Sequence, residues 1–173
     1  MVVVFETHMT SEDNEAGIAT GWLPGRLSAA GREQARELGE RRRDDGLAVV
    51  FTSDLRRAVE TAEIAFAGLP LPVIPDARLR ECNYGELNGT PGPVHDRAAH
   101  LDVAYPGGES WKQAVERVAG FLGELRADRD GKRVLVIDHV ASWLALEIVG
   151  NGRELEELMA APFAWQPGWE YVL

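Results

Sequence analysis

Two apolar segments, far apart in the chain, each run directly into a histidine. Val2-Val3-Val4-Phe5-Glu6-Thr7 leads into His8, and Arg133-Val134-Leu135-Val136-Ile137-Asp138 leads into His139. Apolar, mostly β-branched runs of this length are typical of buried strands in a parallel sheet. Ligands bind just beyond the carboxyl ends of such strands, and imidazole is a nucleophile and an acid–base group near neutral pH. We therefore expect the two histidines to face one pocket.

Segments with strand-like and helix-like patterns alternate along the rest of the chain. Ser28 and Ser53 are predicted to cap two helices, and Glu109 or Ser110 is expected to cap a third. The expected strands cover residues 2–7, 47–52, 71–74, 133–138 and 170–173, and the expected helices cover residues 29–43, 54–66, 111–125, 140–148 and 154–160. Residues 9–27 and 76–109 are expected to be loops. This alternation favours a three-layer α/β/α sandwich with a mostly parallel central sheet.

The composition indicates a single acidic domain. The chain has 173 residues, enough for one hydrophobic core, and we expect residues 1–173 to form one domain. Its 18 basic and 28 acidic residues give a net charge of −10, which argues against binding to nucleic acid or to a membrane surface. The lone Cys82 excludes an intrachain disulfide, and we find neither a signal peptide nor a membrane-spanning run. We therefore expect a cytoplasmic protein, and a chain that stops inside a predicted strand is compatible with a short missing tail.

Six ordered segments carry the motifs of one enzyme family. Thr7-His8-Met9 stands where that family has Arg-His-Gly, and Val136-Ile137-Asp138-His139-Val140 stands where it has a second histidine. The matching segments are 7–14, 20–35, 52–62, 79–89, 106–110 and 136–140. On these motifs the chain resembles the histidine phosphatase superfamily, which includes the cofactor-dependent phosphoglycerate mutases. The resemblance covers the chain almost from end to end and implies a phosphoglycerate mutase-like α/β fold.

The resemblance also implies roles for four residues. His8 would attack a phosphoryl group and become a phosphohistidine, while Arg57 and His139 would bind the phosphoryl oxygens. Glu81 would protonate the leaving group and later activate water. The residues expected to bind substrate are Thr7, Asn14, Thr20, Gly21 and Arg26. The implied substrate is a phosphorylated small molecule, neither a metal nor another cofactor is implied, and family members often form homodimers.

Departures from the family pattern lie within the expected site. Thr7 replaces an arginine and Met9 replaces a glycine, while Asp138 and Val140 flank the second histidine. Loss of one guanidinium removes a charge-assisted contact worth about 1.5–3 kcal/mol. Asp138 would add a negative charge, but successive strand residues face opposite sides, so we expect its carboxylate to point away from His139.

Other loop residues are candidates to complete the site. We predict that Arg26 replaces the missing arginine, in preference to Arg78 or Arg80, because its loop follows the Thr20-Gly21-Trp22 motif. The long loop is expected to shape the substrate pocket. Its candidate contacts are His95, Arg97, His100 and Tyr105.

Three functions remain open at this point. Retention of the four implied catalytic residues favours a small phosphatase that acts through a phosphohistidine on His8. The departures favour a catalytically impaired homologue that binds a phosphorylated ligand or a partner. The third candidate function is a reaction other than phosphate transfer, carried out in an altered pocket. Hydrolysis is preferred over mutase activity, because the interval between the acid-bearing loop and Gly107-Gly108-Glu109-Ser110 is short.

Overall fold

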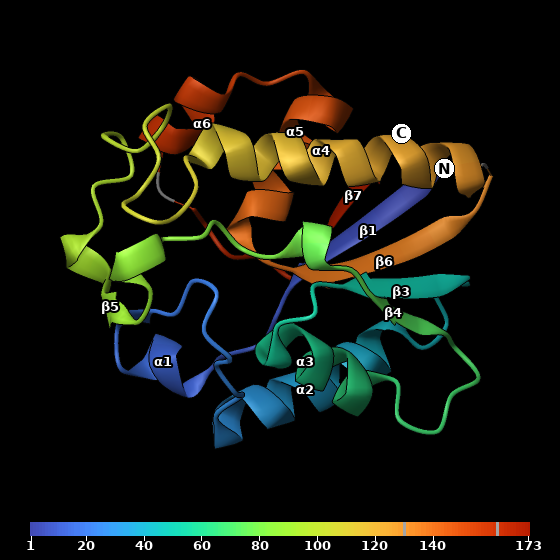
Figure 1. The fold of residues 1–173 in the computed structure, drawn as a ribbon. Coiled ribbons are helices and arrows are strands. Elements are labelled where there is room, and N and C mark those ends of the chain that lie inside the picture. Colours follow the sequence, from blue (N-terminus) through green and yellow to red (C-terminus); the bar gives the residue numbers. More distant parts are fainter. Residues whose placement is uncertain (130, 162) are drawn as a thin grey trace.

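A five-stranded sheet, ordered β4-β3-β6-β1-β7, forms the middle of the molecule (Figure 1). The structure is a computed structural model that describes residues 1–129, 131–161 and 163–173. The strands of the sheet are β1 (Val2–Thr7), β3 (Val49–Thr52), β4 (Val73–Pro75), β6 (Arg133–Asp138) and β7 (Trp169–Val172). All neighbours pair in parallel except β7, which runs antiparallel to β1. The prediction of a mostly parallel sheet is confirmed.

Helices cover both faces of this sheet (Figure 1). One layer consists of α2 (Ala29–Arg42) and α3 (Arg56–Ala65), and the other contains α4 (Trp111–Asp128) and α5 (Val140–Asn151). The remaining elements are α1 (Glu12–Glu15), α6 (Leu155–Ala160), a small sheet of β2 (Ile18–Ala19) and β5 (Thr90–Pro91), and 3-10 turns at Ala77–Leu79, Gly85–Leu87 and Gly92–Val94. The three-layer α/β/α architecture is confirmed. Within the described ranges, no helix is both long and apolar enough to cross a membrane.

The alternation of residues along β1 supplies both layers of the core. Val3 and Phe5 belong to a hydrophobic cluster with residues of α4 and α5, whereas Val4 belongs to a second cluster with residues of α2 and α3. Side chains of a strand point to opposite faces in turn, so an apolar run of this kind is buried on both sides. The same alternation places Glu6 on the α2 side, where Arg42 binds its carboxylate at 2.7 Å.

Two of the three predicted helix caps are confirmed. The Ser28 hydroxyl accepts a hydrogen bond from Gly31 N at 3.1 Å, and the Ser110 hydroxyl accepts one from Gln113 N at 3.2 Å. The prediction for Ser53 is wrong, because α3 begins only after Leu55, which is its N-cap residue. The Ser53 hydroxyl instead lies 2.6 Å from a ring nitrogen of His139.

The prediction of an unbroken loop over residues 9–27 is wrong in two places. A capping box between Ser11 and Asn14 starts α1, and β2 pairs with β5. The partner strand β5 lies about 70 residues further along the chain, so local patterning gave no signal for this pairing. Residues 76–109 contain 3-10 turns and β5 but no α-helix among the residues described there.

Gly31 lets α2 approach the loop that follows His8. A Cβ atom at Gly31 would lie 1.9 Å from the backbone oxygen of Thr10. Alanine has the higher helix propensity, but here backbone atoms would have to shift to admit it. We therefore expect Gly31→Ala to lower the free energy of unfolding by about 1–3 kcal/mol, measured by urea denaturation.

Gly120 on α4 provides the matched control for this substitution. No described atom outside its own helix backbone lies within 4 Å of a Cβ placed there. Gly120→Ala is therefore expected to raise the free energy of unfolding by about 0.5–1 kcal/mol. Equal effects of the two substitutions would contradict the close packing of α2 against Thr10.

Candidate active site

The two histidines lie side by side at the carboxyl ends of β1 and β6. These strands pair in register, with Thr7 opposite Asp138, and His8 N donates to the Asp138 carbonyl oxygen at 2.8 Å. The strands therefore end at the same level, and the ring centroids of His8 and His139 are 5.1 Å apart. Both residues line one cavity, of about 510 Å³. The structure thus brings the two histidines together as expected.

The cavity is bounded by the two strand ends, by α2 and by the loop that precedes β7. Its lining residues are Thr7, His8, Met9, Thr10, Asn14, Gln34, Glu37, Arg41, Glu81, Asp138, His139, Val140, Phe163 and Trp165. Five residues expected at the site are in this set, namely Thr7, His8, Asn14, Glu81 and His139. Arg57 lies behind the lining, is only 3% exposed, and contacts both imidazole rings.

The hydrogen bonds of His8 identify which of its ring nitrogens carries the proton. Its Nδ1 lies 2.8 Å from the carbonyl oxygen of Met9, which can only accept, so the proton lies on Nδ1. The lone pair is then on Nε2, where the Nε–H of Arg57 donates to it at 3.3 Å. Burial, and next the charge of Arg57, lower the pKa of His8 to about 3. His8 is therefore neutral and nucleophilic at physiological pH.

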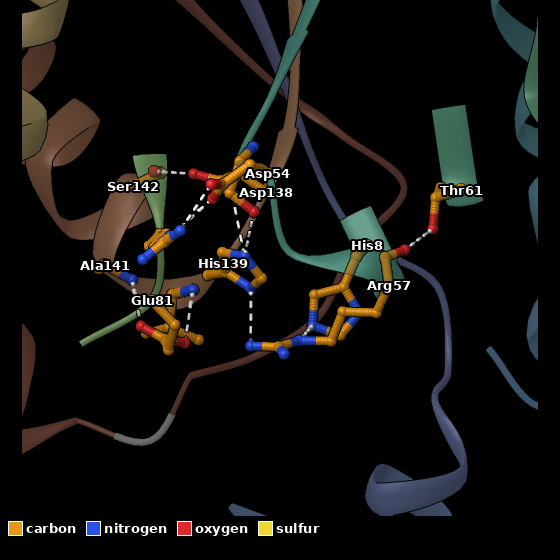
Figure 2. A network of polar contacts seen from close by, with 12 residues as sticks. His8, Asp54, Arg57, Thr61, Glu81, Asp138, His139, Ala141 and Ser142 are labelled. Carbon is orange, nitrogen blue, oxygen red and sulfur yellow. Dashed lines mark hydrogen bonds and ion pairs between the residues drawn. The ribbon is translucent and has the colours of Figure 1, made fainter. Parts of the chain in front are cut away.

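Arg57 contacts both histidines and is held in place by the loop that follows β2. Its guanidinium donates to the backbone oxygens of Gly21 at 2.8 Å and Leu23 at 3.1 Å. The Nη2 atom of Arg57, which binds the Gly21 oxygen, also lies 3.5 Å from Nδ1 of His139 (Figure 2). Burial lowers the pKa of Arg57, while nearby carboxylates, Glu81 first, oppose that shift. The side chain remains a cation because a guanidinium does not deprotonate in proteins.

Asp138 lies against His139 and not away from it, so our expectation for its carboxylate is wrong. Its Oδ1 is 3.2 Å from Nε2 of His139 and accepts a hydrogen bond from Ser53 N at 3.3 Å. The hydroxyl of Ser142 donates to the other oxygen (Figure 2). The strand ends at Asp138 and the chain turns into α5, so alternation no longer decides where this side chain points.

The buried pair of His139 and Asp138 favours uncharged forms. Burial, and next the charge of Arg57, lower the pKa of His139 well below its usual value. Burial raises the pKa of Asp138 well above its usual value, although hydrogen bonds from Ser142 and Ser53 oppose this. A neutral His139 with its proton on Nε2 faces Asp138 and presents its Nδ1 lone pair to Arg57.

Glu81 is bound to the first turn of the helix that follows His139. Its Oε1 accepts hydrogen bonds from Cys82 N at 2.9 Å and from Ala141 N at 3.2 Å, and its Oε2 accepts one from Val140 N at 3.3 Å. Two of these donors belong to the first turn of α5, where N–H groups have no partner within the helix. Glu81 therefore lies at the N-terminus of α5, close to His139 (Figure 2). It lines the same cavity as the two histidines, where an acid–base group can reach a bound substrate.

The structure does not bring Arg26 into the cavity. Its guanidinium is on the surface, 68% exposed, and forms an ion pair with Glu12 at 2.8 Å. Arg78 pairs with Asp76 and Glu124, and Arg80 pairs with Asp54. In the part of the chain that the structure describes, none of these three arginines lines the cavity. Arg26 is therefore not placed to replace the arginine missing at position 7.

Thr20 and Gly21, which were predicted to bind substrate, are not among the described residues that line the cavity. The Thr20 hydroxyl donates to Asp13 at 2.8 Å, and the Gly21 carbonyl oxygen binds Arg57. Met9, the bulky residue in place of a glycine, is 4% exposed and belongs to the hydrophobic cluster under α2 and α3.

Sequence reasoning missed one whole wall of the cavity. Gln34, Glu37 and Arg41 share one face of α2, and Phe163 and Trp165 come from the loop before β7. The spacing of three and four residues was a usable signal for a common helix face. Arg41 stands in the run Arg41-Arg42-Arg43 near the end of this helix, and such a run is equally typical of cations that suit a helix C-terminus.

The long loop contributes to a second, smaller cavity. This cavity has a volume of about 350 Å³ and is lined by Asn14, Gly17, Ile18, Ala19, Tyr84, Gly92, His95 and Arg97. Asn14 borders both cavities. His100 stacks on Tyr105, with ring centroids 3.8 Å apart. Two of the four predicted loop contacts, His95 and Arg97, therefore lie on a cavity wall.

The low pKa of His8 predicts a stability that depends on pH. Its pKa is about 3 in the folded chain and 6.5 as an ordinary histidine. Below pH 6.5 the unfolded chain binds a proton that the folded chain does not, so stability falls as the pH falls toward the folded pKa. Relative to His8→Asn, the native chain is expected to lose about 1.4 kcal/mol of unfolding free energy per pH unit in this window. Urea denaturation from about pH 7.5 to about pH 4.5 measures the difference. A difference that stays constant would contradict a buried neutral His8.

Comparisons with known proteins identify the family of this chain. A family model described as the histidine phosphatase superfamily (branch 1) matches residues 6–160. The uncharacterized phosphatase PhoE of Bacillus subtilis strain 168 is 35% identical over 133 residues, which cover 75% of this chain and 68% of that protein. A 2,3-bisphosphoglycerate-dependent phosphoglycerate mutase of Parvibaculum lavamentivorans is 32% identical over 180 residues, covering 94% of this chain and 86% of the mutase.

Solved structures show the same fold. Bacillus stearothermophilus YhfR superposes with a TM-score of 0.86 at 24% identity, covering 98% of this chain and 89% of that one. A mycobacterial glucosyl-3-phosphoglycerate phosphatase superposes with a TM-score of 0.78 at 26% identity, covering 92% and 83%. From the match of residues 6–160, from these relatives, and from a histidine pair at the ends of β1 and β6, it follows that the chain belongs to the histidine phosphatase superfamily, a family of phosphatases and mutases.

Proposed function

We propose that the chain is a phosphomonoester phosphatase that acts through a phosphohistidine on His8. The observation that carries this proposal is the state of the His8 ring. A backbone oxygen holds its proton on Nδ1, and Nε2 lies against the Arg57 guanidinium beside the cavity. A neutral nucleophile next to a fixed cation is what attack on a phosphate ester requires.

The first half of the reaction transfers the phosphoryl group to the protein. Nε2 of His8 attacks phosphorus, a P–N bond forms, and the P–O bond to the leaving group breaks. Arg57 stabilises the negative charge on the phosphoryl oxygens during the transfer to His8. Glu81 gives its proton to the departing oxygen, so the leaving group departs as a neutral alcohol.

The second half of the reaction restores the protein. Glu81, now a carboxylate, takes a proton from a water molecule that attacks phosphorus. The new P–O bond forms as the P–N bond to His8 breaks, and inorganic phosphate is released. Hydrolysis is preferred over mutase activity because the interval between the acid-bearing loop and Gly107-Gly108-Glu109-Ser110 is short.

Two departures support a second candidate, a homologue that binds a phosphorylated ligand without turning it over. Thr7 brings no charge to the cavity, and the carboxylate of Asp138 lies 3.2 Å from His139. Such a protein would bind phosphate without forming a covalent intermediate.

Trapping the intermediate distinguishes the two candidates. The native chain is exposed to radiolabelled p-nitrophenyl phosphate, quenched in alkaline detergent, and digested for peptide mapping. We expect acid-labile phosphate on the peptide that contains His8, and none on the peptides with the other three histidines. Label on a different histidine would contradict His8 as nucleophile. Absence of label, with inorganic phosphate still bound in calorimetry, would support the second candidate.

A further inference from the structure

The cavity wall formed by α2 carries an arginine that the proposed mechanism does not use. Gln34, Glu37 and Arg41 all line the cavity from one face of this helix. At one end of the face, the Gln34 side chain accepts a hydrogen bond from Thr10 N at 3.1 Å, which ties α2 to the loop after His8. At the other end, Arg41 reaches the β1 residue Glu6.

The charge around the cavity shows why this arginine matters. Three lining residues, Glu37, Glu81 and Asp138, carry carboxyl groups. Among the lining residues that the structure describes, Arg41 is the sole lysine or arginine. Phosphoryl transfer requires cations around the oxygens of the transferred group, and Thr7 supplies none.

Arg57 does not by itself remove this deficit. Its guanidinium is buried behind the cavity lining and is already bound to two backbone oxygens, those of Gly21 and Leu23. A substrate that carries two negative charges therefore meets one cation at the histidine pair, and Arg41 is the further cation among the described lining residues.

The contacts of Arg41 leave it able to move. Its Nη2 lies 3.1 Å from Oε1 of Glu6, and the side chain is 34% exposed. Arg42 donates to the same oxygen from two atoms, at 2.9 Å and 2.7 Å, and is only 12% exposed. Glu6 therefore stays paired with Arg42 when Arg41 releases it, so the movement leaves no buried charge without a partner.

Position also favours Arg41 as a ligand of the substrate. Glu6 lies near the end of β1, and His8 directly follows Thr7, the last residue of that strand, so the two residues are about 6.6 Å apart along the strand direction. Before substrate binds, Arg41 is held at Glu6 and is therefore close to His8. Arg41 and His8 line the same cavity. The guanidinium offers a planar fork that matches two phosphate oxygens.

We propose that Arg41 is a substrate-binding residue that supplies, from α2, the positive charge that the chain lacks at Thr7. This inference rests on the proposed function, because it assigns a ligand to the phosphate of the same cavity. In the free protein Arg41 pairs with Glu6, and on binding it exchanges that contact for an oxygen of the substrate phosphate.

The test compares Arg41→Met with Arg36→Met. Arg36 lies on the same helix, is exposed, and pairs with Glu33 outside the cavity. We expect Arg41→Met to lower kcat/KM for p-nitrophenyl phosphate, and to weaken competition by inorganic phosphate, by roughly 10- to 100-fold. Arg36→Met is expected to stay within about twofold of the native chain, as is usual for a surface ion pair.

A double variant tests whether an arginine at position 7 can replace the charge of Arg41. Thr7→Arg is added to Arg41→Met, and we expect it to restore most of the lost kcat/KM and phosphate affinity. Equal values for Arg41→Met and Arg36→Met would overturn the proposal, and so would a failure of Thr7→Arg to restore binding.

Calorimetry keeps this test independent of turnover. Binding of inorganic phosphate to the native chain and to both single variants needs no covalent step. A native chain that forms no phosphohistidine, but binds phosphate more tightly than Arg41→Met does, would refute the proposed reaction and support the role of Arg41. Unchanged phosphate affinity in Arg41→Met would refute that role, whatever the labelling experiment shows.

Discussion

His8→Asn is expected to abolish hydrolysis of p-nitrophenyl phosphate, with a loss of roughly 10⁴- to 10⁶-fold in kcat. Asparagine keeps a polar side chain at the position but has no nitrogen lone pair that can attack phosphorus. The covalent route through Nε2 is then closed, and the remaining groups can only bind the ester. The measurement is the initial rate at about pH 7.5, where the native His8 is neutral.

The control for this variant is a histidine away from the nucleophilic position. His95 lies on the smaller cavity, where its Nε2 contacts the Thr90 hydroxyl at 3.0 Å. His95→Asn is expected to retain turnover of this small substrate. Cooperative urea unfolding of His8→Asn shows that its fold is intact. Turnover that survives in a folded His8→Asn would exclude the phosphohistidine mechanism.

Arg57→Met is expected to lower kcat/KM by about 10²- to 10³-fold. The guanidinium contacts both imidazole rings, and methionine has a similar length without the charge. The kcat/KM of Arg57→Lys should lie between those of the native chain and Arg57→Met, because an ammonium keeps the charge but cannot bind His8 and two loop carbonyls at once. The rates are to be measured with p-nitrophenyl phosphate across the pH range.

The same variant has a signature in the pH profile. Arg57 is the second cause, after burial, of the low pKa of His8. Without that charge the pKa of His8 rises toward 6.5, so the acidic limb of the rate profile moves to higher pH. Arg56→Met is the matched control, because Arg56 is exposed and pairs with Glu63 at 3.1 Å. Equal rates for the two variants would show that Arg57 does not act in transfer.

The parts of the fold that were predictable depend on short-range chemistry. The two apolar runs were recognisable because β1 and β6 are buried on both faces, which requires a nearly continuous series of apolar residues. Caps at Ser28 and Ser110 follow from side chains that bond to backbone N–H groups three residues away. Parallel pairing then places both strand ends at one level, so the histidine pair was predictable as well.

The residues that were not predicted depend on contacts across the chain. Arg26 belongs to a loop near the site, but Glu12 holds its side chain at the surface. Ser53 has the residue type of a cap, yet its hydroxyl binds His139, from another strand. Arg41 enters the cavity only because α2 packs beside β1, and the run of three arginines gave no indication of which one faces inward. Local propensity carries no information about such distances.

The hydrogen bonds of Glu81 link its protonation state to the backbone amides at the start of α5. The Glu81 side chain accepts hydrogen bonds from Val140 N and Ala141 N, so the group proposed to exchange protons with substrate and water also anchors the start of a helix. When Glu81 is protonated, one oxygen becomes a donor, and an amide of that first turn loses its acceptor. The amide resonances of Val140 and Ala141 therefore report the charge state of Glu81 in each step, without a probe attached to the substrate.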